Sequence, residues 1–372
     1  MVTRTGRGEI QPRGNSNNAP PVVAPSIFSV DSEGDNSQIE PSPSVTQQFG
    51  ELSNLDSTTI SALNQLDDAA LVSLGSSLEV VPSQLRGEYL DIIAIDMAKG
   101  EALIQFRTFE TPERFSNVFN AIESPGDVAI MERVMNEDYL DSLGEMMAGR
   151  YRKLLDDIAN GNPPPVAKYA EPLSFSERLK ILDKVKSVKT ELAQKTENAP
   201  ADVQEKMSIT ARNIGYGSYD ITLPNGETVE GDFISTSSKT SSRGADLLEY
   251  TGETLDDGRT IVPDFPKKRT SKFFEATESI RANDSERKAF EYIMGQIKSK
   301  LSKDRISFKP IDDLSSASKE VALYEGQGFS GEITIYSEMK PCDSCEDVFT
   351  EQFAKYFGND ILVQIKYGVQ FP

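Results

Sequence analysis

Residues 331–345, with the sequence GEITIYSEMKPCDSC, determine the fold class of this chain. Ile333 and Ile335 alternate with polar residues, which predicts a strand over 332–337. Pro341 separates this strand from a helix expected over 343–357, and a second apolar run predicts a strand over 361–366. A strand, a helix and another strand in this order indicate an α/β unit that carries two cysteines at its helix start.

The segment before this unit supplies two further strands and a helix. Alternating apolar residues on both sides of Asn225-Gly226 predict a β-hairpin over 221–235. Helical spacing follows at about 284–301, after a long Ser/Thr/Gly-rich loop over 235–280. Residues 205–372 are therefore predicted to form an α/β domain, with a mixed sheet that starts with a hairpin and is flanked by helices.

The first half of the chain divides into two regions of different composition. Residues 1–55 are rich in Ser, Asn, Pro and acidic residues, so a disordered tail is expected there. Residues 56–204 have helical periodicity and predict a small α-helical domain. Within it, Thr111-Pro112 and Ser124-Pro125 are typical helix starts, and one continuous apolar stripe covers 139–158.

Composition excludes several classes of function. The chain has 372 residues, a net charge of -20 and no histidine, which excludes Ser-His-Asp and Cys-His catalysis and every metal site that uses histidine. Its two cysteines, Cys342 and Cys345, cannot build a disulfide framework for a chain of this length. No apolar run is long enough for a transmembrane helix, and the first residues do not form a secretory signal peptide. If the protein is exported, a different route must recognise it.

Two short motifs could carry chemistry, and each also has a simpler interpretation. Asp284-Ser285-Glu286 opens one predicted helix and Pro341-Cys342-Asp343-Ser344-Cys345 opens the next. Zinc deaminases usually pair an H-x-E motif with P-C-x-x-C, and Asp284 departs from this pattern by standing in the place of the histidine. Zn²⁺ also accepts carboxylate oxygen as a ligand. Alternatively, Asn283 and Glu286 form a capping box, and Cys342 and Cys345 form a redox pair. Both motifs occur at helix starts, which favours the catalytic interpretation.

On these residues, together with the hairpin 221–235 and the Gly331–Glu338 strand, the C-terminal domain resembles the bacterial polymorphic-toxin branch of the zinc-dependent nucleotide and nucleic-acid deaminase superfamily. The resemblance implies a deaminase-like fold over 205–372, zinc bound by Asp284, Cys342 and Cys345, and Glu286 as the proton shuttle. It also implies a secreted effector that acts in the cytoplasm of a target cell, with the N-terminal parts serving delivery and a cognate immunity protein as partner.

The expected substrate is a nucleobase, cytosine in preference to adenine, in nucleic acid or a nucleotide. Residues 267–309 contain twelve basic and six acidic side chains, which suits a phosphate backbone, although a solvated helix face is an equal alternative. Arg281, Arg287 and Lys288 are the candidate substrate-binding residues within this range. Two other functions stay open at this point: a catalytically inactive deaminase-like binding module and a C-x-x-C thiol oxidoreductase.

Overall fold

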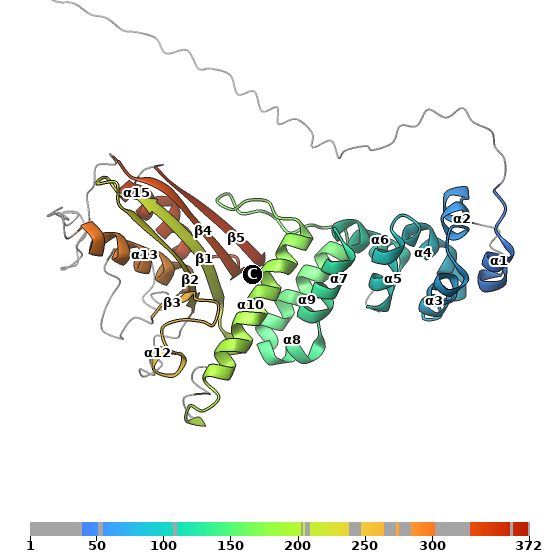
Figure 1. The fold of residues 1–372 in the computed structure, drawn as a ribbon, viewed down its shortest axis with the longest axis horizontal. Helices are drawn as coiled ribbons and strands as arrows, with labels where there is room; N and C mark the ends of the chain where they lie inside the picture. The colour runs from blue at the N-terminus through green and yellow to red at the C-terminus, as the bar shows by residue number, and fades with distance from the viewer. Residues whose placement is uncertain are drawn as a thin grey trace, which may run out of the picture. The chain divides into compact units, whose positions relative to one another are not determined.

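The computed structural model describes residues 39–50, 55–106, 110–201, 204, 209–237, 247–263, 273–274, 284–301, 328–357 and 360–370 (Figure 1). Residues 41–372 group into one compact unit. None of the helices within the described ranges is long and apolar enough to cross a membrane. Most of the predicted tail, residues 1–38, lies outside the described residues.

Helices make up the first half of this unit, and polar residues fix where they start. They are α1 (Pro43–Phe49), α2 (Ser57–Leu63), α3 (Asp68–Leu78), α4 (Arg86–Ile93), α5 (Met97–Gln105), α6 (Pro112–Ala121), α7 (Pro125–Val134), α8 (Glu137–Leu143), α9 (Glu145–Ala159) and α10 (Phe175–Lys195). The predicted starts at Thr111 and Ser124 are confirmed, because each side chain accepts a hydrogen bond from a backbone N–H of its helix. Ser174 and Glu177 cap α10 reciprocally.

Two sequence predictions for this region are wrong in detail. Helix α1 lies inside the predicted tail and buries Val45 completely, so the ordered region starts before residue 55. The apolar stripe over 139–158 does not form one helix, because α8 ends and α9 begins at Gly144, whose φ of 79° interrupts the helix. Only glycine adopts such a backbone conformation without strain, so this residue was the missed signal.

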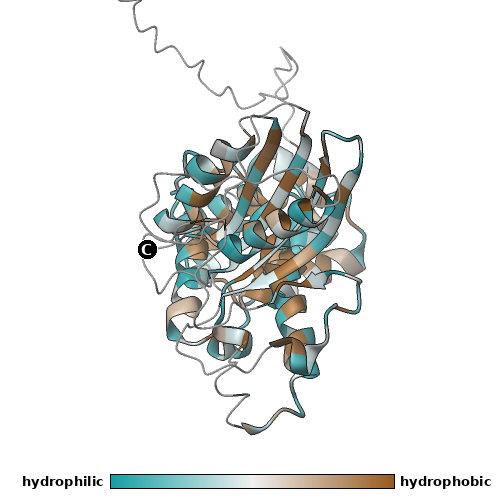
Figure 2. Cartoon of the chain, turned by 90° about the vertical axis from the view of Figure 1, so that its left-hand side faces the viewer, coloured by the Kyte–Doolittle hydropathy of each residue, from teal (hydrophilic) through white to brown (hydrophobic). Residues whose placement is uncertain are grey.

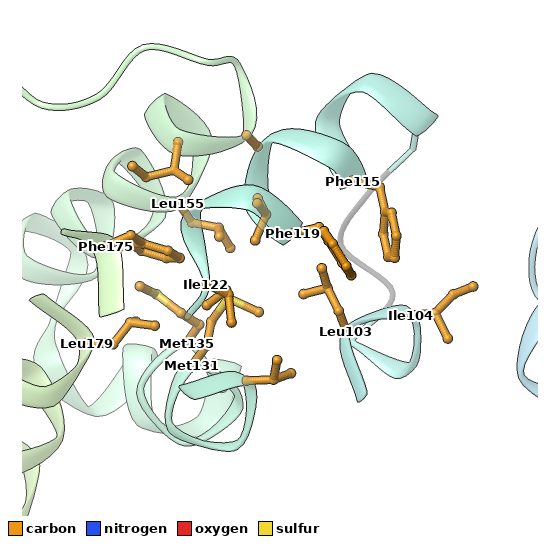
Figure 3. Close-up of a cluster of buried hydrophobic side chains, with 14 of the residues drawn as sticks. Leu103, Ile104, Phe115, Phe119, Ile122, Met131, Met135, Leu155, Phe175 and Leu179 are labelled. Carbon is orange, nitrogen blue, oxygen red and sulfur yellow. The ribbon is translucent and has the colours of Figure 1, made fainter. Parts of the chain in front are cut away.

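Apolar side chains of these helices form one continuous core. Phe115 and Phe119 of α6 point toward Leu103 of α5, and Met131 of α7 lies near Leu179 of α10 (Figure 3). The same cluster includes Leu182 of α10 and Val369 of the last strand, so the helical core continues onto the sheet. Burial of these side chains stabilises each by about 1.5–3 kcal/mol relative to an exposed position.

The second half is the predicted α/β fold with a five-stranded mixed sheet. The strands are β1 (Ile214–Thr222), β2 (Thr228–Thr236), β3 (Thr260–Ile261), β4 (Ser330–Met339) and β5 (Ile361–Val369), and the helices are α12 (Leu247–Thr251), α13 (Ser285–Leu301), α14 (Asp343–Asp347) and α15 (Phe353–Phe357). The strand order is β3-β2-β1-β4-β5, with β1 antiparallel to β2 and β4, and parallel pairing at β4–β5 and β2–β3. Gly226, at φ 82°, turns the predicted hairpin. The sequence missed β3 and α12.

Helices cover both faces of the sheet (Figure 1). Ile333 and Ile335 of β4 face α13 and α15, whereas the next residue, Tyr336, faces α10. Hydrophobic and hydrophilic residues alternate along parts of the strands (Figure 2), and consecutive buried residues occur where both faces are covered, as at the end of β2. A π-helical turn, η5 (Val348–Gln352), joins α14 to α15, so the helix predicted over 343–357 is present but not regular.

This arrangement corrects the predicted boundary at 204. Helix α10, which the sequence assigns to the separate helical domain, packs on β1, β4 and β5 and forms one layer of the α/β fold. Ile214 and Ile234 of the sheet are completely buried in the cluster that includes Val185 of α10. The helical pattern of α10 shows an apolar face, but it does not show which core that face joins.

Candidate metal centre

The starts of α13 and α14 bring the two predicted motifs together at one end of the sheet. Asp284 directly precedes α13, and its carbonyl oxygen accepts the backbone hydrogen bond of Lys288, 3.0 Å away. Cys342 holds the equivalent position before α14, where Glu346 donates to its carbonyl oxygen at 2.9 Å. Helix N-termini favour anionic groups, so a carboxylate and thiolates suit these positions.

The side chains of Asp284, Cys342 and Cys345 form a compact set of metal donors. Their ligand atoms all lie within 4.8 Å of one another. Asp284 Oδ2 is 3.3 Å from Cys342 Sγ and 3.6 Å from Cys345 Sγ. In a tetrahedral zinc site with bonds of about 2.0–2.3 Å, neighbouring donor atoms are about 3.3–3.8 Å apart. Within the described part of the chain, these three donors therefore fit one zinc ion and would leave one tetrahedral position for a further ligand.

Glu286 lies beside this set without belonging to it. The Glu286 side chain is buried, and its Oε2 atom is 3.7 Å from Cys345 Sγ. Its other oxygen, Oε1, accepts hydrogen bonds from the Ser337 hydroxyl and from Asn213 Nδ2, the latter at 3.0 Å. One carboxylate oxygen is thus held by the protein while the other remains near the donors.

Burial and neighbouring charges shift the pKa of the acidic groups at this site. Burial raises the pKa of Glu286, the Ser337 hydrogen bond opposes this rise, and the Asp284 carboxylate adds to it. The Cys342 hydrogen bond, burial and the Glu286 and Asp284 carboxylates raise the pKa of Cys345. The same thiol contact lowers the pKa of Cys342. A bound dication would lower the pKa of Glu286 and of both thiols, because its positive charge stabilises carboxylates and thiolates.

Sequence reasoning missed three residues that support the site. Two of them, Asn213 and Ser337, form hydrogen bonds with Glu286. Asn213 directly precedes β1 and Ser337 is near the end of β4, and a polar residue near a strand terminus is only a weak sequence signal for a functional site. Tyr169, in the loop between α9 and α10, donates a hydrogen bond to Pro341 O at 3.1 Å. Its ring packs edge-on against Phe349, with centroids 4.9 Å apart. No local pattern links Tyr169 to a cysteine motif more than 170 positions away.

The predicted substrate-binding residues are corrected by their burial. Arg287 is 2% exposed, and its guanidinium donates to Phe274 O; Lys288 is fully buried. These buried side chains cannot contact a phosphate backbone. Like Glu286, they lie on the part of α13 that packs inside the protein. Arg281 and Asn283, and with Asn283 the proposed capping box, lie outside the described residues, as does most of the basic stretch 267–309.

A second polar cluster lies on the opposite face of β4. Glu338 Oε1 is 2.7 Å from Lys189 Nζ of α10 and accepts a hydrogen bond from the Tyr151 hydroxyl of α9 at 2.8 Å. Lys189 and Glu338 are 1% and 0% exposed, and Lys189 also donates to Thr210 O at 2.9 Å. Burial lowers the pKa of Lys189, although Glu338 counteracts this effect. Adjacent residues of β4, Ser337 and Glu338, thus connect the metal centre to the helical half.

Comparison with known proteins gives no match: no protein-family model, no curated protein and no solved structure matches this chain.

Proposed function

We propose that this protein is a zinc-dependent hydrolytic deaminase of a nucleobase. The observation that carries the proposal is that the ligand atoms of Asp284, Cys342 and Cys345 lie within 4.8 Å of one another, with the buried acid Glu286 beside them. Deaminases need these two parts and little else at the reacting atoms: an ion that activates water, and a carboxyl group that carries protons but does not bind the ion. Asp284 stands where this chemistry usually has histidine.

Zinc held by these three residues would supply an activated water as the nucleophile. Glu286 would hold and move the protons at Oε2: it would take one from the attacking water and deliver it to the ring nitrogen of the base. A second transfer through Glu286 would accompany departure of the exocyclic amine as ammonia, and the base would keep the water oxygen as a carbonyl. Ser337 and Asn213 hold Oε1, so the carboxyl group keeps its orientation through both transfers.

Cytosine is the proposed base in preference to adenine, in nucleic acid or in a nucleotide. We further propose a bacterial toxin or effector role, with a cognate immunity protein as partner and the cytoplasm of a target cell as the place of action. These parts of the proposal rest on the resemblance of residues 205–372 to polymorphic-toxin deaminases.

Two amide variants of the full-length protein test the reaction. After zinc loading, the parent is incubated with single-stranded and duplex DNA, RNA and free nucleotides, and products are identified by mass spectrometry. Glu286→Gln keeps the size and the accepting oxygen of the side chain, so zinc content should stay at one per chain while base conversion falls about 10²–10⁴-fold. Asp284→Asn should lose zinc as well as activity.

The outcomes separate the proposed function from the alternatives. A parent that binds one zinc but converts no substrate supports an inactive binding module. Glu286→Gln that deaminates as fast as the parent would falsify the mechanism. Glu132→Gln, at an exposed residue of α7, is a matched control for loss of one negative charge and should behave as the parent does.

A thiol oxidoreductase is the second candidate, and one observation favours it. Cys342 is partly exposed with a lowered pKa, whereas Cys345 is buried with a raised pKa, an asymmetry that suits an attacking and a resolving thiol. The carboxylate of Asp284 near both sulfurs argues against it, since negative charge disfavours a thiolate. The metal site is supported if the purified protein contains zinc and its thiols react with a disulfide only after the zinc has been removed by a chelator.

A further inference from the structure

Asn213 lies where the elements of the metal centre meet. It directly precedes β1 and is 7% exposed. Its side-chain nitrogen Nδ2 lies 2.8 Å from Ser285 Oγ, 3.0 Å from Glu286 Oε1 and 3.3 Å from Ser337 Oγ. Its side-chain oxygen accepts a hydrogen bond from Met339 N at 3.1 Å. Both ends of one buried amide are thus used within the site.

These contacts join the two segments that carry the metal donors. Ser285 and Glu286 directly follow the donor Asp284 at the start of α13. Met339 is at the end of β4, just before Pro341 and Cys342. The Asn213 backbone also binds Ser237 beyond β2, through Ser237 N to Asn213 O at 2.8 Å and Asn213 N to Ser237 Oγ at 3.0 Å. One residue therefore fixes the start of α13 relative to the ends of β2 and β4.

The amide also determines which way the Glu286 carboxylate faces. A serine hydroxyl can either donate or accept, whereas the amide nitrogen only donates. Asn213 Nδ2 therefore requires an acceptor at Oε1, which leaves Oε2 on the side of Cys345. Unpaired polar groups are costly in a buried site, so this orientation of the amide and the carboxylate is strongly favoured.

We infer that Asn213 is a positioning residue that orients Glu286 and aligns Asp284 with the cysteine pair. Its catalytic consequence rests on the proposed deaminase function, but its effects on zinc affinity and on the coupling to Glu286 do not. Partners that orient metal ligands without binding the ion typically change affinity or activity about 10–100-fold when removed.

The coupling is tested in the full-length protein by a double-mutant cycle followed by urea unfolding. Asn213→Asp places an oxygen opposite Glu286 Oε1, so the urea midpoint should fall. In the Glu286→Gln background the glutamine can turn its nitrogen toward that oxygen, and the fall should shrink by more than half. Asn117→Asp is the matched control, because Asn117 Nδ2 donates to Ala159 O at 2.8 Å, far from Glu286 in the helical half. Its effect should be equal in both backgrounds.

A second variant keeps the inference testable if Asn213→Asp does not fold. Asn213→Ala removes the donors without adding charge. Its zinc affinity, measured by competition with a chelating dye, should fall about 10–100-fold. On whichever nucleobase the parent converts, kcat should fall while KM stays within twofold, since the substrate contacts are untouched.

Either of two results overturns the assignment: equal midpoint shifts for Asn213→Asp in both backgrounds, or parental zinc affinity and kcat in Asn213→Ala. A parent without deaminase activity removes the proposed function, whereas the unfolding cycle and the zinc affinity still decide on Asn213.

Discussion

The carboxyl group of Glu286 is buried beside the donors of the candidate metal centre. Burial raises its pKa, and hydrogen bonds from Ser337 and Asn213 keep it oriented. A raised pKa makes the carboxylate a better proton acceptor than an ordinary glutamate, which suits the proposed shuttle. The same shift has a consequence for stability that needs no substrate.

Metal-free protein should lose stability through Glu286 as the pH rises. The folded-state pKa is raised above the unfolded value of about 4.3, so the folded state holds a proton that the unfolded chain has released. This contribution is complete below about pH 4.3 and is lost as the pH rises through the folded-state pKa. The advantage of Glu286→Gln over the parent should therefore grow with pH, by about 1.4 kcal/mol for each pH unit between the two pKa values.

Urea unfolding in the presence of a chelator, at several pH values between 4 and 8, measures this difference. Glu132→Gln, at an exposed residue of α7, controls for the loss of one negative charge from an acidic chain. Parallel stability curves for Glu286→Gln and the parent would show that burial does not perturb Glu286.

Single residues also decide how elements begin and end. Gly144 separates α8 from α9 with φ 79° and ψ 156°, a region almost restricted to glycine. Gly149 lies within α9, and a Cβ atom would meet nothing within 4 Å at either position. The two glycines therefore differ in backbone conformation and not in available space.

Alanine at these positions should change stability in opposite directions. Gly144→Ala should lower the free energy of unfolding by about 1–3 kcal/mol, because alanine is strained in this conformation. Gly149→Ala should raise it by about 0.5–1 kcal/mol, because alanine is the better helix former. Thermal unfolding of the two variants beside the parent gives the answer, and stabilisation by Gly144→Ala would mean that α8 and α9 form one helix.

The pair Lys189–Glu338 links α10 to β4 without access to water. Removal of one partner should cost about 3–5 kcal/mol, since the other charge is left buried. Lys189→Met and Glu338→Gln should each show this loss in urea unfolding. The double variant Lys189→Met/Glu338→Met should recover most of the stability. Additive losses in the double variant would show that packing, and not the charge pair, dominates at this contact.

At the scale of the whole molecule, the α/β fold depends on helices from the first half of the chain. Helix α10 covers one face of the sheet, and Arg178 of α10 donates to Tyr367 O of β5 at 2.9 Å. Tyr169 and Tyr151 reach Pro341 and Glu338 from the same half. The donors of the candidate metal centre thus lie within residues 205–372, but the segment and strand that carry them also pack against residues outside this range.

Truncation should reveal this dependence. A fragment 205–372 lacks α10 and exposes the buried faces of Ile214, Ile234 and Ile261, so it should aggregate or show no cooperative unfolding. A fragment 39–372 should unfold cooperatively and bind one zinc. Circular dichroism and elemental analysis compare the two, and a cooperative, zinc-binding 205–372 would restore the boundary that the sequence predicts.

The sequence by itself determined several elements of this protein, although not α1, α12 or β3, and it named the candidate donors of its site. Alternation in β4, the Asn-Gly turn at 225–226 and the caps at Thr111 and Ser124 are local signals, and the structure confirms each of them. The absence of histidine left the two thiols and a carboxylate oxygen as candidate donors, and the motif Asp284-Ser285-Glu286, with the resemblance it carries, pointed to Asp284. Such signals succeed because helix starts, turns and strand periodicity depend on residues a few positions apart.

Only the tertiary structure decided which of these parts belong together. It brought Asp284 within 3.3 Å of Cys342, buried Arg287 and Lys288, and placed α10 on the sheet. It also assigned Asn213 to Glu286, 73 positions away, and Glu338 to Lys189, 149 positions away. The physical reason is that burial and long-range hydrogen bonds arise from packing between elements, which the periodicity of each element does not encode.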